Sequence, residues 1–103
     1  MLKYQLQMQN SLNFSNYISD FLKNVQYCQE KDVILNIIAQ TANITDSIIK
    51  LNIIINQLHL TELHDPTCIR FKYYLIYILD ILNNSKASND TLVTLKSQIK
   101  NFC

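Results

Sequence analysis

The residues best equipped for chemistry gather in one short stretch that holds two histidines, two carboxylates and a cysteine. They are His59, Glu62, His64, Asp65 and Cys68. Such groups ligate zinc and related metals, and histidine also serves in acid–base catalysis. The spacing fits no standard metal motif, because His64 leaves the helix face that His59 and Glu62 would share. We therefore expect a helix end with capping side chains, with no metal and no catalytic residue, and keep a ligand or metal site near His59–Cys68 as an alternative.

The cysteine and glycine content points away from disulfide frameworks and nucleotide chemistry. The chain has three cysteines, Cys28, Cys68 and Cys103, and no glycine. An odd number of cysteines at wide spacing is no disulfide framework, and a free cysteine on an apolar stripe is usually a small core residue. The glycine-rich loops of Walker-type and dinucleotide-binding sites are effectively excluded. The sequence thus predicts a protein that is not an enzyme and has no cofactor.

Charge and hydropathy argue against two further classes of partner. Nine basic and eight acidic residues are scattered along the chain, with no basic cluster for a nucleic acid. The most apolar run, residues 68–82, is too short and too charged to span a membrane. The N-terminus, MLKYQLQMQN, lacks the apolar run of a signal peptide. We expect a cytoplasmic protein with reduced thiols.

The most suggestive functional pattern is a line of large side chains at helical spacing. It consists of Arg70, Tyr73, Tyr77 and Asp80. Tyrosine combines an apolar ring with a polar tip and is enriched at protein interfaces. We interpret this line as a partner-binding surface. The other interpretation is that the tyrosines seal the rim of the core.

Apolar periodicity predicts the elements that carry these residues: an all-α fold, a small four-helix bundle, in a single domain of residues 1–103. Residues 33–58 are predicted to form a long second helix with two apolar stripes at the centre of the bundle, and a kink or break near residues 43–46 stays open. The other helices are expected at residues 11–29, at 66–84 after an Asp–Pro cap, and at about 90–101. Residues 29–31 are interpreted as a polar break before the second helix. The core line of the helix at 66–84 is predicted to be Cys68, Phe71, Leu75, Leu79 and Leu82. Residues 1–10 are taken as a loose extension of the first helix, and a strand stays open for residues 66–84.

The second and third predicted helices offer more apolar faces than a bundle of this size can cover. A second copy of the chain or a helix of another protein would bury the surplus. We therefore expect a non-enzymatic protein-interaction module, such as an adaptor, chaperone or inhibitor, that binds a protein partner or forms a homo-oligomer. A structural subunit of a larger assembly is the remaining alternative. No stretch carries a family motif that we recognise.

Overall fold

The computed structural model describes residues 13–26, 28–84 and 88–101, and these form helices and connecting turns without a strand. Five helices follow one another in this part of the chain: α2 (Phe14–Asn24), α3 (Cys28–Gln40), α4 (Ser47–His59), α5 (Pro66–Asn84) and α6 (Asn89–Lys100). The all-α prediction is confirmed, and the strand alternative for residues 66–84 is wrong because they form α5. The prediction for residues 1–10 falls outside the described residues.

The long second helix expected at residues 33–58 is interrupted and forms two helices, α3 and α4. After α3, the hydroxyl of Thr41 donates to the carbonyl oxygen of Ile38 (2.7 Å), and the backbone N–H of Thr41 donates to that same oxygen (3.0 Å). Hydroxyl bonds of this kind compete with the helical ladder. Asp46 then starts α4, because its carboxylate accepts the N–H groups of Ile48 and Ile49. The break lies where a kink was left open, and it makes five described helices instead of four.

The predicted boundary between the first and second helices also differs from the structure. The first described helix ends at Asn24 rather than at residue 29, and α3 begins at Cys28. It therefore includes residues 29–31, which were predicted to be a polar break, and Asp32, which was expected to cap the next helix. Polar residues at the start of α3 lie on its outer side, where Gln29 and Asp32 are exposed. Their polarity therefore marks a solvated helix face.

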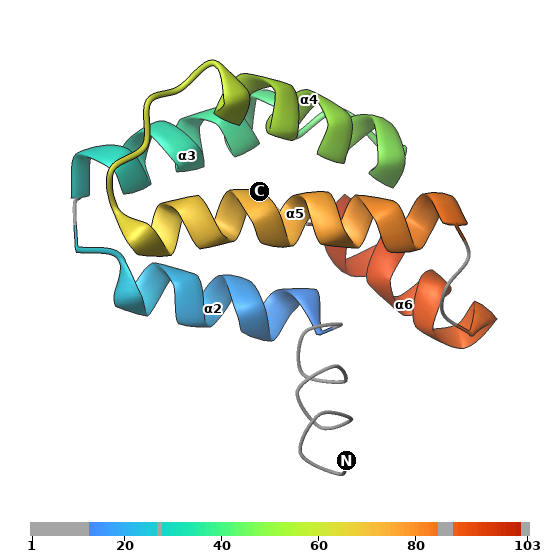
Figure 1. Ribbon diagram of the computed structural model, residues 1–103. Coiled ribbons are helices and arrows are strands. Elements are labelled where there is room, and N and C mark those ends of the chain that lie inside the picture. Colours follow the sequence, from blue (N-terminus) through green and yellow to red (C-terminus); the bar gives the residue numbers. More distant parts are fainter. Residues whose placement is uncertain (1–12, 27, 85–87, 102–103) are drawn as a thin grey trace, which may run out of the picture.

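The helix with the most packing partners is α4. It packs against α3, α5 and α6, while α5 and α6 each pack against α2 as well. In Figure 1, α5 runs between α2 on one side and the α3–α4 pair on the other. One cluster of buried residues joins these helices and includes Phe14, Phe21, Ile34, Ile38, Leu51, Ile54, Leu58, Phe71, Leu75, Ile78, Leu95 and Ile99. The central place expected of residues 33–58 thus falls to their second part, α4, while the single long helix expected there is not formed.

Polar bonds hold α6 against its neighbours. Oε1 of Gln98 accepts the backbone N–H of Phe14 (2.9 Å), the first residue of α2. The hydroxyl of Ser47 donates to the carbonyl oxygen of Lys96 (2.8 Å) and so connects the start of α4 to α6. Buried side-chain nitrogen and oxygen atoms in the described residues, including those of the fully buried Lys50, all have hydrogen-bond partners. None of the described helices has the length and apolar character to cross a membrane.

Candidate functional site

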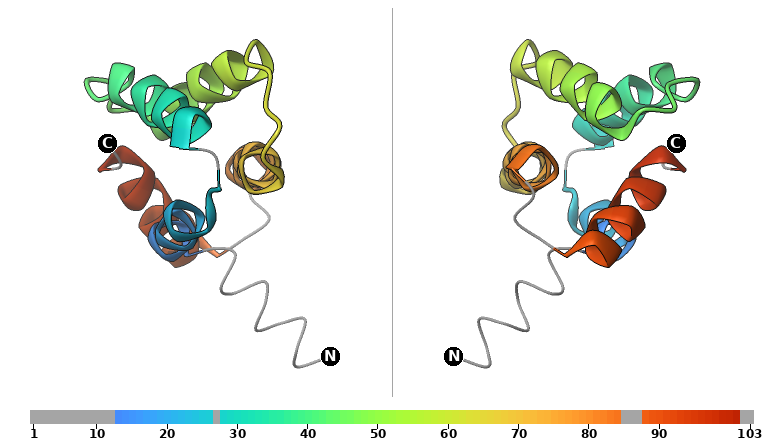
Figure 2. Two further views of the ribbon diagram at one scale, coloured as in Figure 1. Left: turned by 90° about the vertical axis from the view of Figure 1, so that its left-hand side faces the viewer. Right: turned by 90° about the vertical axis from the view of Figure 1, so that its right-hand side faces the viewer.

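The four residues predicted to bind a partner lie along one outer face of α5. Arg70 is exposed, Tyr73 is 60% exposed, Tyr77 is 38% exposed and Asp80 is half-buried. In both end-on views of Figure 2, α5 lies at the margin of the molecule, with α3 and α4 above it and α2 and α6 to one side. The structure therefore brings these four side chains together on a face that no described helix covers.

The tyrosines of α5 divide between the core and the surface. Tyr74 is only 7% exposed, and its ring stacks on that of Tyr17 from α2, with centroids 3.5 Å apart. One turn earlier, Phe71 stacks on Phe21 at 4.2 Å. Burial raises the pKa of Tyr74 far above its usual value, and the neighbouring Tyr17 adds to the shift. Tyr74 thus fits the rim-sealing interpretation, whereas Tyr73 projects a largely exposed ring from the same helix.

The exposed face has opposite charges near its two ends. Arg70 donates a long hydrogen bond (3.4 Å) to the hydroxyl of Thr67 and forms no ion pair with another described residue. Burial raises the pKa of Tyr17, and the charge of Arg70 partly counteracts that rise. At the other end, the carboxylate of Asp80 accepts a hydrogen bond from the side-chain amide of Asn84. A carboxylate accepts several donors at once, so a donor from a partner can add to this bond.

Two smaller features border the tyrosines. The ammonium of Lys72 lies 5.3 Å from the ring centroid of Tyr73, within the range of a cation–π contact. A shallow groove of about 350 Å³ between α2 and α5 includes Arg70 and Asp20 in its lining. The groove is open and polar, as expected at the rim of a protein interface. A small-molecule site would instead enclose most of its ligand in apolar walls.

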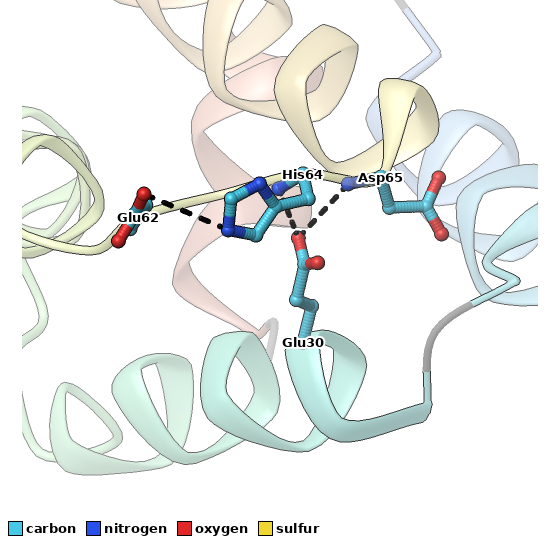
Figure 3. A network of polar contacts seen from close by, with 4 residues as sticks. All are labelled: Glu30, Glu62, His64 and Asp65. Atoms are coloured by element: carbon cyan, nitrogen blue, oxygen red, sulfur yellow. Dashed lines mark hydrogen bonds and ion pairs between the residues drawn. The ribbon is translucent and has the colours of Figure 1, made fainter.

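The stretch His59–Cys68 runs from the last residue of α4 through the connecting residues 60–65 into the first turn of α5, and polar groups hold the backbone of the connection in place (Figure 3). Oε1 of Glu30, from α3, accepts the backbone N–H groups of His64 (2.9 Å) and Asp65 (3.1 Å). The imidazole of His64 lies 3.7 Å from the carboxylate of Glu62, and both side chains are exposed. No group of three or more His, Cys, Asp or Glu side chains in the described residues is placed to hold a metal ion.

Asp65 is the key residue of this connection. It is fully buried, and its Oδ1 accepts the N–H of Thr67 (2.9 Å) in the first turn of α5, while Oδ2 accepts the N–H of Gln26 (2.7 Å). Pro66 follows as the first residue of α5. The predicted Asp–Pro cap is confirmed, and it also ties the start of α5 to the segment between α2 and α3.

Cys68 has the environment of a structural cysteine. Its side chain is a buried free thiol on the core side of α5. Burial, with smaller contributions from the carboxylates of Asp65 and Glu30, raises its pKa to about 12. Since the thiolate is the reactive form, this thiol is held inert near neutral pH.

Two features of the surface were not predicted. Glu30 was read as part of a polar break, and only its position in space, beside residues 64 and 65, reveals its role. Part of the second apolar stripe expected on residues 33–58 is uncovered, because Ile49 and Ile53 of α4 are exposed and Leu60 beyond its end is almost fully so. The surplus of apolar faces was visible in the sequence, but its position on α4 depends on where the chain turns.

Comparison with protein-family models, with curated proteins and with solved structures finds no match to this chain.

Proposed function

We propose that this chain is a non-enzymatic protein-interaction module that binds another polypeptide through the outer face of α5. The observation that supports the proposal is the exposure of Tyr73 and Tyr77 on a helix whose opposite side forms the core. The functional residues of this surface are Arg70, Tyr73, Tyr77 and Asp80. No cofactor takes part, and the partner is a protein rather than a nucleic acid.

The physical reason is the cost of leaving such side chains in water. A tyrosine has few rotatable bonds and a large ring, so it offers much contact area at small entropic cost when it is buried by a partner. Binding hot spots are enriched in tyrosine and arginine near the centre of an interface. Here two tyrosines occupy the middle of the line and charged residues flank them, which is the usual order of apolar centre and polar rim.

The rigid presentation of this face supports the same function. Phe71 and Tyr74 fix the inner side of α5 by stacking on Phe21 and Tyr17 of α2. The buried Asp65 fixes the start of the helix. A face presented on an ordered helix loses little conformational entropy when a partner binds.

The experiment that tests the proposal is capture of partners from an extract of the source organism, together with sedimentation of the purified protein. The test variant is Tyr73→Glu, and the matched control is Val93→Glu, which also places a carboxylate at an exposed helical position, on α6. We expect Tyr73→Glu to remove a specific captured protein or a self-associated species while thermal unfolding and helical content stay unchanged. Val93→Glu should retain the binding. If wild type captures nothing and sediments as a monomer, or if Tyr73→Glu binds like wild type, the proposal is wrong.

A further inference from the structure

The outer face of α5 has the spacing of a coiled-coil seam. Its outermost positions are Pro66, Arg70, Tyr73, Tyr77, Asp80 and Asn84, all exposed except the half-buried Asp80. The steps between them alternate between four and three residues, as in the heptad pattern that aligns a stripe against a second helix. The faces toward α2 and α4 are already used in the core, so this seam is the side left for another helix.

The order of the side chains along the seam is self-complementary. Arg70 stands near one end, Asp80 near the other, and Tyr73 and Tyr77 lie between them, placed symmetrically about Leu75. If two such helices pack antiparallel about a two-fold axis through that midpoint, each Arg70 faces Asp80 of the second copy, and each Tyr73 faces Tyr77 of the second copy. Parallel packing would instead place arginine on arginine and aspartate on aspartate.

We propose that the partner of this face is a second copy of the chain, bound through an antiparallel pairing of α5 with α5. The inference rests on the proposed function and names its partner. Two Arg–Asp pairs and two tyrosine pairs form across the axis. Ile69 and Ile76, both half-buried beside the seam, become covered in the same contact.

Two other surfaces lack such a match. The exposed side chains Ile49, Ile53 and Leu60 are apolar without flanking opposite charges to set a direction of packing. The groove of about 440 Å³ between α2 and α6 includes Ile18 and Leu22 in its lining but no charged residue. The seam of α5 therefore specifies both the partner and its orientation.

The pairing forms a weak, reversible dimer. One pair of helices buries less area than a standard protein interface, and small interfaces belong to transient complexes. Exposed ion pairs contribute modestly to affinity, but they select between orientations. We expect a dissociation constant in the micromolar range and sensitivity to salt.

The first test uses charge reversal and complementation, with dissociation constants measured by sedimentation equilibrium. Arg70→Glu alone places two like-charged pairs in the homodimer, and so does Asp80→Arg alone. Each should weaken association about 10- to 30-fold. An equimolar mixture restores attraction, because the introduced carboxylate of one variant meets the introduced guanidinium of the other, and the two native side chains also pair. The mixture should associate within about threefold of wild type. The control is Lys23→Glu, which makes the same change of charge at an exposed position of α2, and it should associate like wild type.

Thermal unfolding of each variant shows whether it is folded, and a second measurement does not depend on Asp80→Arg. In Arg70→Lys, a carbodiimide joins the introduced ammonium to a carboxylate in contact with it. Residues 70 and 80 of one chain are about 15 Å apart along the helix, so a bond between them forms between two copies. Mixed ¹⁴N- and ¹⁵N-labelled chains should yield a cross-linked 70–80 peptide of mixed isotopic mass.

The inference is overturned if wild type stays monomeric up to about 1 mM or if Arg70→Glu dimerises like wild type. It is also overturned if folded Arg70→Glu and folded Asp80→Arg fail to associate in the mixture, or if no 70–80 cross-link forms. A monomeric wild type that still captures a protein in a Tyr73-dependent manner would overturn the dimer and leave the proposed function standing. A monomeric wild type that captures no protein would overturn both the dimer and the proposed function.

Discussion

The buried carboxylate of Asp65 makes a sharp prediction about how the chain holds α5 in place. In Asp65→Ala, the first turn of α5 loses its cap, and the N–H of Gln26 loses a 2.7 Å acceptor in a partly buried place. Loss of an N-cap costs about 1 kcal/mol, and an unsatisfied donor in a partly buried place costs about 1–2 kcal/mol more. We expect a total loss of about 2–3 kcal/mol, which lowers the melting temperature of a chain of this size by about 10–20 °C.

Asp46 supplies a matched control for this prediction. It caps α4 with the same kind of side chain, accepting the N–H groups of Ile48 (2.9 Å) and Ile49 (3.0 Å), but it is exposed and both bonds are local. Asp46→Ala should therefore cost about 1 kcal/mol. Asp65→Asn should lie between the two alanine variants, because asparagine is an equally good cap but its single amide oxygen replaces two acceptors.

Urea unfolding followed by circular dichroism measures these differences directly. The free energy of unfolding of Asp65→Ala should fall below that of Asp46→Ala by about 1–2 kcal/mol with similar denaturant slopes. If the two alanine variants agree within about 0.5 kcal/mol, the bond from Gln26 to Asp65 contributes no stability, and the account of how the start of α5 is fixed is wrong.

Three further predictions concern the two sides of α5. Phe71→Ala should destabilise the fold by about 3–5 kcal/mol through the cavity left beside Phe21, whereas Tyr73→Ala should change stability by less than about 0.5 kcal/mol in the monomer. If urea unfolding shows that both variants lose the same free energy of unfolding, the division of α5 into a core face and an outer face is wrong. In a Cys28→Ser/Cys103→Ser variant, the thiol of Cys68 should react with a disulfide reagent at pH 8 far more slowly in the folded protein than in denaturant, because burial raises its pKa to about 12; comparable rates would refute its burial. The free energy of unfolding should stay level up to about pH 9 and fall as the pH rises toward about 12, because the unfolded chain releases the Cys68 proton from its usual pKa of 9.0 while the folded chain retains it. The raised pKa values of Tyr17 and Tyr74 act in the same direction. The variant Cys68→Ala, measured over the same pH series, should show a shallower fall.

Local sequence signals predicted the local features of this fold well. The Asp–Pro pair marked the start of α5, and the 3.6-residue period separated most of its core side from its outer side: Cys68, Phe71, Leu75 and Leu82 are buried as predicted, and Leu79 is half-buried. The same period placed Arg70, Tyr73, Tyr77 and Asp80 on one face. These outcomes depend on spacing within a single helix, which the sequence displays directly.

Features that depend on distant residues could not be predicted. The chain turns after Thr41 because the hydroxyl of Thr41 bonds to the end of α3 and the carboxylate of Asp46 caps the start of α4. The apolar pattern of the sequence continues through this turn and does not reveal it. That turn leaves Ile49 and Ile53 exposed on α4, while the other side of α4 packs against α3, α5 and α6. Glu30 was read as a helix break because nothing in its neighbours shows the two N–H groups that it accepts from residues 64 and 65.

The antiparallel pairing of α5 with α5 can be followed in a series of ¹H–¹⁵N correlation spectra recorded as the protein concentration rises from about 10 µM to about 1 mM. If the pairing forms, amide signals move progressively for residues along the seam, around Arg70, Tyr73, Tyr77 and Asp80, while those of α3 and α6 stay in place. Spectra that do not change over this range, or shifts confined to α4 or to the groove between α2 and α6, would contradict it.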